Sequence, residues 1–339
     1  LAPEDATDKM AIGTVFVTNS TSITLKRPFI SADLSLDGKS DSVYVAGAGE
    51  DIKCEITWEN NLDVPVNDAV IQARITGPML DKLTIQGDQG FYRSVDNTIL
   101  WDSSTLEGLK ELKAGDVGRL QFSFAAVKPN VENNSTFRRE EMKVELTIRA
   151  KRLNEDKVPE EVVSGVSRTI KIASDLGLTT RLVRNIGPFV NTGPMPTMPE
   201  QPSTFTVLVS LKNSYNNVKD VVYTATLPQY VEWLGQTYPT NSPVTYNADK
   251  RQITWQVGDM QPGIGYSSSA KDFAFQVSFL PSLGQLGSTP SIVLNQKIAG
   301  KDNFTGKITE TKADPLDIKI ETDPKFKYGD DKVGGEDLN

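Results

Sequence analysis

Apolar and polar residues alternate along most apolar segments of this chain, and this alternation limits its fold more than any other feature. The segment "IKCEITW" (52–58) places Ile, Cys, Ile and Trp on one side of an extended chain, and "MKVELTIRA", "STFTVLVSL" and "DFAFQVSF" repeat the pattern. A period of two residues is typical of β-strands with one buried face. Helical spacing is confined to the short segment "SSTLEGLKELKAG". The sequence therefore predicts an all-β protein.

The two halves of the chain repeat one order of landmarks. An alternating strand ends at Asn60 or Asn213, and "VNDAVIQARI" or "VKDVVYTATL" follows it. A strand with a tryptophan then leads to a glycine-marked turn and an apolar strand. Matched landmarks in the same order indicate internal duplication. The predicted framework consists of Trp58, Asn60, Asp68, Trp101 and Gly115 in the first half and of Asn213, Asp220, Trp255 and Gly263 in the second.

About seven short strands in each half, separated by turn residues, favour two tandem immunoglobulin-like β-sandwich domains. The length of 339 residues suits two domains of ~150 residues each. We expect the domains at 30–175 and 176–323, and a charged C-terminal linker at 324–339. Residues 1–29 contain "TVFVTNSTSITL", which predicts an extra strand or hairpin. The proline-rich stretch "GPFVNTGPMPTMPEQPS" has the composition of an interdomain linker, whereas its counterpart "DGKSDSVYVAGAGED" is expected to be a crossing loop within the first domain.

The composition restricts the chemistry open to this chain. It has no histidine and one cysteine, Cys54, which excludes Ser-His-Asp and Cys-His nucleophilic sites, histidine-containing zinc sites and an intrachain disulfide. Cys54 alternates with isoleucines and is expected to be buried. The net charge of −8 argues against nucleic acid as a partner. No apolar run approaches the ~18 residues of a membrane span. Because the chain begins with Leu1, we expect a processed or trimmed product.

The repeated pattern resembles an immunoglobulin-like bacterial surface repeat. The pattern consists of an Asn-ended strand, a "V-x-D-V/A-V" strand, an "I-x-W" strand, a Pro/Gly turn and an apolar strand ending in Phe. The phrases "NTGPMPTMPEQPSTFTVLVSLKN" and "KDNFTGKITE" are similar to versions found in small-genome uncultured bacteria. The resemblance implies an exported, non-catalytic module of a stalk, coat or adhesive element at the cell surface. It carries no functional site over, because the motif residues are framework.

Oxygen-rich loops are the candidate metal sites. The residues concerned are Asp37, Asp41, Glu155, Asp156 and Asp302, and calcium is the cation that such loops suit. Polar turns have the same composition without a metal. Four Asn-x-Ser/Thr triplets, at Asn19, Asn133, Asn134 and Asn303, are candidate glycosylation sites. No other cofactor is expected.

Three functions remain open from the sequence. The first is a non-enzymatic, extracellular structural or adhesive protein that contacts other proteins and self-associates into a surface layer or filament. The second is a carbohydrate-binding module, for which the candidate aromatic residues are Tyr215, Tyr230, Trp233 and Tyr238. The third is a histidine-free glycoside hydrolase, which would need a cleft with convergent carboxylates. Asp68 and Asp220 occupy matched positions, and this favours a shared turn or surface role over a catalytic pair.

Overall fold

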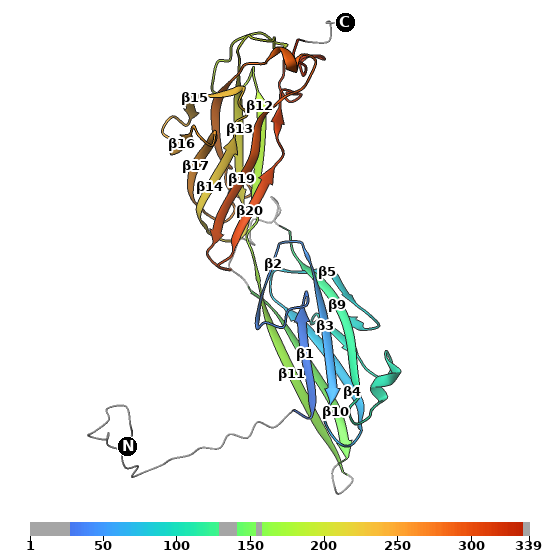
Figure 1. The fold of residues 1–339 in the computed structure, drawn as a ribbon. Helices are drawn as coiled ribbons and strands as arrows, with labels where there is room; N and C mark the ends of the chain where they lie inside the picture. The colour runs from blue at the N-terminus through green and yellow to red at the C-terminus, as the bar shows by residue number, and fades with distance from the viewer. Residues whose placement is uncertain (1–27, 129–140, 154–157, 335–339) are drawn as a thin grey trace, which may run out of the picture.

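The structure is a computed structural model, and it describes residues 28–128, 141–153 and 158–334. Strands form nearly all of its regular structure, so the predicted all-β class is confirmed. Four sheets make two β-sandwiches that follow one another end to end (Figure 1). The predicted N-terminal strand or hairpin, at 1–29, falls almost wholly outside the described residues.

The first sandwich consists of a four-stranded and a seven-stranded sheet. In order across the first sheet, the strands are β1 (Ile30–Leu36), β3 (Asp51–Asn60), β9 (Val117–Ala126) and β5 (Leu80–Gly87). The second sheet contains, in order, β2 (Val43–Ala46), β11 (Pro159–Ile172), β10 (Glu141–Leu153), β4 (Val66–Thr76), β7 (Thr98–Trp101) and β6 (Phe91–Arg93), with β8 (Glu111–Leu112) beside β4. The predicted helical segment forms only one 3-10 turn, η1 (Glu107–Lys110).

The second sandwich has a four-stranded and a six-stranded sheet. Across the first sheet run β12 (Leu176–Val183), β13 (Ser203–Asn213), β18 (Lys271–Phe279) and β15 (Val231–Tyr238). The second sheet contains β16 (Val244–Asn247), β17 (Gln252–Met260), β14 (Val218–Thr226), β19 (Ser291–Asp302) and β20 (Ile308–Ala313), with β21 (Leu316–Asp317) beside β19. A 3-10 turn, η2 (Leu283–Gln285), follows β18.

The two sandwiches share one strand order. The order β1-β3-β9-β5 corresponds to β12-β13-β18-β15, and β11-β10-β4-β7-β6 corresponds to β20-β19-β14-β17-β16. The main difference is β2, which pairs in parallel with β11 at the edge of the first sandwich. The chain between β1 and β3 thus crosses to the second sheet, as the sequence predicted for a crossing loop. The chain between β12 and β13 takes another path.

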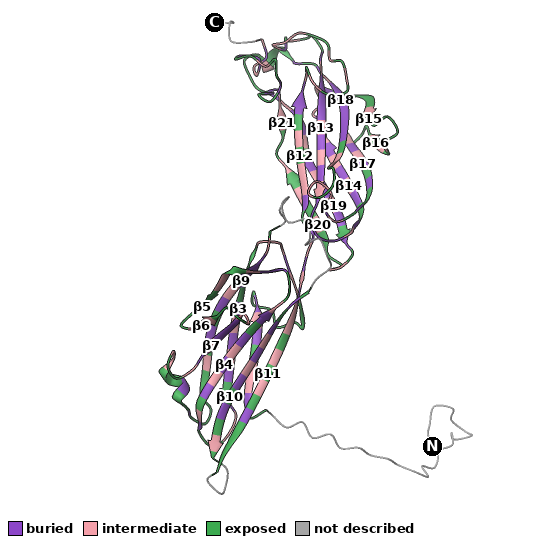
Figure 2. Ribbon diagram, turned by 180° about the vertical axis from the view of Figure 1, so that it is seen from behind, coloured by how far each residue is buried: buried purple, intermediate pink, exposed green. Residues whose placement is uncertain are grey.

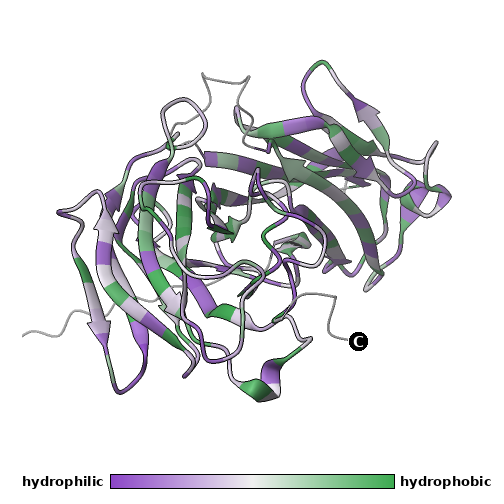
Figure 3. Cartoon of the chain, turned by 90° about the horizontal axis from the view of Figure 1, so that it is seen from above, coloured by the Kyte–Doolittle hydropathy of each residue, from purple (hydrophilic) through white to green (hydrophobic). Residues whose placement is uncertain are grey.

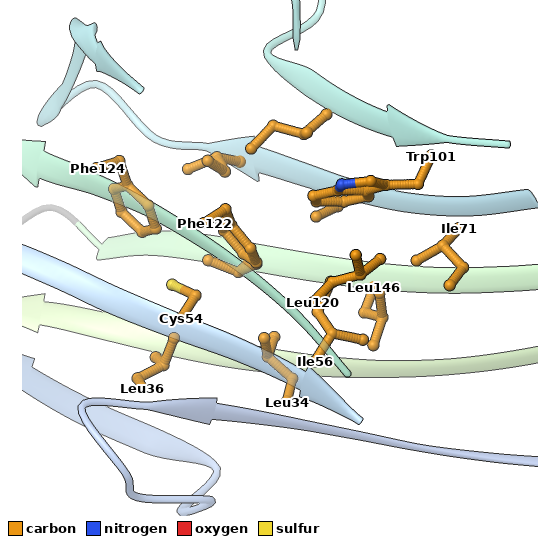
Figure 4. Close-up of a cluster of buried hydrophobic side chains, with 14 of the residues drawn as sticks. Leu34, Leu36, Cys54, Ile56, Ile71, Trp101, Leu120, Phe122, Phe124 and Leu146 are labelled. Carbon is orange, nitrogen blue, oxygen red and sulfur yellow. The ribbon is translucent and has the colours of Figure 1, made fainter. Parts of the chain in front are cut away.

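Each sandwich has its own apolar core. Apart from Tyr215, the first core consists of residues up to Ile172 and the second of residues from Leu176 onward. Buried residues alternate along the strands, as Figure 2 shows by exposure and Figure 3 by hydropathy. Trp101 is fully buried against Phe122, with 6.1 Å between ring centroids (Figure 4), and its Nε1 donates to the Asp88 carbonyl at 2.7 Å. Trp255 is 4% exposed and stacks on Phe273 at 4.6 Å. Burying an indole removes roughly 200 Å² from water, so both residues stabilise their cores strongly.

The proline-rich stretch does not join the domains, and the linker prediction was wrong. It lies between β12 and β13 and covers the outer face of β13 and β18. Gln276 Nε2 donates to the carbonyl of Val190 and to Asn191 Oδ1, both at 3.0 Å, and Asn191 Nδ2 donates to Thr206 Oγ1 at 2.9 Å. Prolines suit an extended segment bound to a sheet as well as a linker.

The C-terminal segment is also not a linker over the part that the structure describes, 324–334. Val333 is fully buried in the second core, and its backbone pairs with Gly287 and Ser288. The Asp323 carboxylate accepts from the backbone N–H groups of Arg184 and Asn185, both at 2.7 Å. The linker prediction was wrong because it rested on the charge of the segment, and a few buried contacts suffice to order a charged segment. Among the described residues, no helix is long and apolar enough to cross a membrane.

Candidate functional site

The connection between the sandwiches is short, and its polar groups are buried. Three residues separate the end of β11 at Ile172 from the start of β12 at Leu176. The middle one, Ser174, is 3% exposed, and its N–H donates to the Asp302 carboxylate at 2.7 Å. Asn216 Nδ2 donates to the same carboxylate and to the carbonyl of Ile172, both at 2.8 Å. The end of the first sandwich, at Ile172, is therefore bonded to the β13–β14 loop of the second, and the connecting Ser174 is bonded to the end of β19.

The hydroxyl of Ser174 completes this network. It donates to Asn213 Oδ1 at 2.7 Å and accepts from the backbone N–H groups of Tyr215 at 3.1 Å and Asn216 at 3.0 Å. All of these groups are buried, and a buried polar group without a partner costs about 1–3 kcal/mol. These bonds fix Ser174, the middle residue of the connection, to the loop between β13 and β14 of the second sandwich.

Tyr215 crosses from the second sandwich into the first. It lies on the loop between β13 and β14, yet its side chain is 2% exposed and belongs to the apolar core of the first sandwich. Its hydroxyl donates to the carbonyl of Val127. Burial raises the pKa of the Tyr215 phenol. The prediction of an exposed sugar-binding aromatic at this position was wrong, because strand alternation says nothing about where a loop side chain points.

Two cationic side chains make further contacts between the two sandwiches. Lys171 Nζ lies 4.8 Å from the ring centroid of Phe304, and Lys307 Nζ donates to the carbonyl of Val45 at 3.4 Å. Together, five residues form the junction between the sandwiches: Ser174, Asn213, Tyr215, Asn216 and Asp302.

The framework asparagines hold equivalent loops in the two sandwiches. Asn60 Nδ2 donates to the carbonyls of Val64, Leu112 and Lys113 at 3.0–3.1 Å. Asn213 Nδ2 donates to the carbonyls of Asn216, Met260 and Gln261 at 2.8–3.0 Å. The carbonyl of each asparagine accepts from the framework glycine, Gly115 or Gly263, whose φ of +75° or +83° suits a residue without a Cβ. Trp58, the remaining framework tryptophan, is 5% exposed.

Asp68 and Asp220 also match, and they share a backbone conformation. Their φ values are +50° and +51°, and each lies where the strand pairing shifts register. Aspartate tolerates this left-handed conformation better than most residues. Asp68 faces solvent and pairs with Lys151 at 3.4 Å. Both lie at irregularities within β4 and β14 and not in turns, and their shared backbone conformation favours a structural role over a catalytic one.

Each sandwich has a groove on the outer face of its four-stranded sheet. The first groove has a volume of about 680 Å³, and one row across its floor contains Ser35, Glu55, Gln121 and Asp88. The second groove has a volume of about 510 Å³, and its row contains Arg181, Leu208, Ala274 and Tyr238. Glu55 and Leu208 lie equally far before their framework asparagines, so the two rows are equivalent. One scaffold thus presents a polar, acidic groove and an apolar, aromatic one.

The other predicted aromatic residues are placed less favourably for a ligand. Tyr230 is half-buried against Phe279, at 5.7 Å between ring centroids. Trp233 is half-buried against Tyr246, at 5.3 Å. Of the four candidates, only Tyr238 is exposed, at 57%. In the sequence, Pro239 follows Tyr238 directly, and it marks the end of β15 at Tyr238.

The calcium candidates are not brought together where the structure describes them. No group of three or more acidic or cysteine side chains with metal-binding geometry occurs within 28–128, 141–153 and 158–334. Asp302 instead accepts four N–H groups, from Ser174, Asn216, Phe304 and Thr305, at 2.7–3.0 Å. Asp37 accepts from the Tyr44 hydroxyl at 2.5 Å, and Asp41 is exposed. Glu155 and Asp156 lie outside the described residues.

One of the four glycosylation candidates can be placed. Asn303 is exposed in the turn between β19 and β20, close to the junction. Asn19, Asn133 and Asn134 fall outside the described part of the chain.

Comparisons with known proteins give only distant similarities. No protein-family model matches the chain, and no curated protein matches it. Solved structures that resemble it include the C-terminal domain of the AgI/II polypeptide BspA from Streptococcus agalactiae, with 8% identity and a TM-score of 0.29 over 85% of this chain and 99% of that one. The C-terminal domain of AspA from Streptococcus pyogenes has 8% identity and a TM-score of 0.29, over 85% of this chain and 99% of that one. BcpA, the major pilin subunit of Bacillus cereus, has 11% identity and a TM-score of 0.27, over 85% of this chain and 65% of that one. Similarity at this level does not place the chain in a family.

Proposed function

We propose that this chain is a non-enzymatic structural or adhesive protein of a cell surface, built from two immunoglobulin-like repeats that form a stalk, surface layer or filament. The observation that carries the proposal is the junction. A tyrosine of one sandwich fills the core of the other, and buried hydrogen bonds fix the connection. A spacer must hold its domains in line against pulling and bending, and an inserted side chain with satisfied polar groups does so.

The shared framework supports the same proposal. Asn60 and Asn213 organise equivalent loops, so one stable scaffold is used twice, as in the immunoglobulin-like surface repeats that the sequence resembles. We propose membership of that family on this ground, together with an extracellular location and contacts with other proteins.

Antibody labelling of intact and permeabilised producing cells tests the location. We expect labelling of intact cells, and labelling only after permeabilisation would contradict the proposal. Negative-stain imaging of the native material then distinguishes a lattice or fibre from single rods.

A further inference from the structure

We propose that the second groove binds a carbohydrate that carries a carboxylate group, such as a uronic acid. The pairing of the strands places Arg181, Leu208, Ala274 and Tyr238 abreast on four neighbouring strands of one sheet face. At a strand spacing of about 4.8 Å, the first and last Cα atoms are about 14 Å apart. This length accommodates a sugar ring at one end and an anionic group at the other.

The Tyr238 end of the groove suits the apolar face of a sugar ring. Tyr238 is 57% exposed, and Leu208 and Ala274 form an apolar floor beside it. Pro188 and Pro239 also line the groove. A pyranose has C–H groups on its faces and hydroxyls around its rim, so it can stack on a phenol ring while its rim stays hydrated. The volume of about 510 Å³ lies in the range of small-molecule sites.

The Arg181 end supplies the charge selectivity. Arg181 is exposed, and none of the described residues forms an ion pair or hydrogen bond with its guanidinium. A guanidinium binds a carboxylate through two parallel N–H···O bonds, which no neutral sugar group can reproduce. A carboxylated sugar is therefore the ligand that uses both ends of the groove.

A second polar row can orient the hydroxyls of the sugar. Thr179, Ser210 and Asp272 lie abreast on the adjacent row of the same face. Ser210 Oγ donates to Asp272 Oδ1 at 2.7 Å, which holds the carboxylate in place. Its other oxygen can accept from a sugar hydroxyl, and the Thr179 hydroxyl can donate or accept.

The first groove provides a matched contrast within the same chain. The equivalent row there contains Ser35, Glu55, Gln121 and Asp88, with two carboxylates and no aromatic ring. The lining also includes Asp37 and Lys53, so three carboxylates face one ammonium group in this groove. It should therefore repel an anionic sugar, and its residues supply control substitutions on the same scaffold.

The experiment uses the full chain on an array of uronate and sialic acid glycans, with the methyl ester of each as a neutral partner. Isothermal titration with trigalacturonate and its methyl ester then compares wild type with Tyr238→Ala, Arg181→Gln and, as a control, Glu55→Ala. We expect binding of the acid form, a loss of about tenfold or more in each groove variant, and no loss in the control. The Arg181→Gln variant should no longer prefer the acid over the ester.

Several results would overturn the proposal. They are the absence of any carboxylated ligand on the array, equal binding of acid and ester by wild type, and unchanged binding by Tyr238→Ala or Arg181→Gln. Both side chains are exposed and lie away from the junction, so the variants should melt at the wild-type temperature. The test therefore bears on the groove alone and leaves the proposed structural role standing in either case.

Discussion

Asn213 accepts a hydrogen bond from the hydroxyl of Ser174 through its side-chain oxygen, while its amide nitrogen holds three carbonyls of its own sandwich. In the first sandwich, the equivalent oxygen of Asn60 accepts from the backbone N–H of Leu62 at 3.1 Å and from no other group within the described part of the chain. The framework asparagine of the second sandwich thus also belongs to the junction. One side chain therefore holds both the loops of its own sandwich and the segment that connects the two sandwiches.

Replacing Ser174 with alanine should destabilise the second sandwich. The change leaves Asn213 Oδ1 and the N–H groups of Tyr215 and Asn216 buried without this partner, at a cost of about 2–4 kcal/mol. Denaturant unfolding followed by tryptophan fluorescence measures the free energy of unfolding. The exposed substitution Thr240→Ala serves as the control, and equal stability of the two variants would refute the role given to Ser174.

Replacing Tyr215 with alanine should uncouple the two domains. The variant removes a side chain buried in the first core and its bond to Val127, while both frameworks stay intact. We expect wild type to unfold in one coupled transition and Tyr215→Ala in two, as seen by calorimetry. Tyr238→Ala, which removes an exposed tyrosine of the second sandwich, should retain the single transition. A single transition in both variants would show that the tyrosine does not couple the domains.

Asp302 should act as a structural acceptor and not as a calcium ligand. Its carboxylate has about four acceptor positions, and four N–H groups occupy them. Asp302→Asn places an amide against these donors and should lower stability by about 2–3 kcal/mol, with or without calcium. The measurement is thermal melting with calcium and with a chelator. A chelator-induced shift in wild type that disappears in Asp302→Asn would instead identify a calcium site there.

Cys54 should make stability fall at alkaline pH. Burial raises the pKa of its thiol, and the charge of Asp37 adds to the effect. The unfolded thiol ionises near pH 8.5, whereas the folded one stays protonated. The contribution is therefore complete below about pH 8.5 and is lost as pH rises, by up to about 1.4 kcal/mol per pH unit. Cys54→Ala should show a shallower decline between pH 8.5 and 9.5, and parallel curves would contradict this account. Native thiol labelling should also be slow.

The strands and their buried faces could be predicted from the sequence because each depends on neighbouring residues. In β3, the residues that alternate inward from Ile52 to Trp58 are all buried. The match between Asn60 and Asn213 was visible for the same reason: one local strand ending occurs twice. The predicted distribution of apolar side chains follows directly from the period of two.

The path of the long connections could not be predicted. Whether the proline-rich segment joins domains or covers a sheet depends on Thr206 and Gln276, which come together only through the pairing of β13 with β18. The junction was missed for a similar reason, since Asp302 and Ser174 are far apart in the chain. The grooves depend on register across four strands. Tyr238 was one aromatic candidate among four until its row was known.

Double electron–electron resonance between spin labels at Lys110→Cys and Lys250→Cys tests most directly whether the junction makes one rigid rod of the two sandwiches. Both sites are exposed and lie in different sandwiches, and Cys54 is too buried to take up label under native conditions. We predict a single narrow distance distribution that broadens in Tyr215→Ala. A broad distribution in the wild-type background would contradict the account.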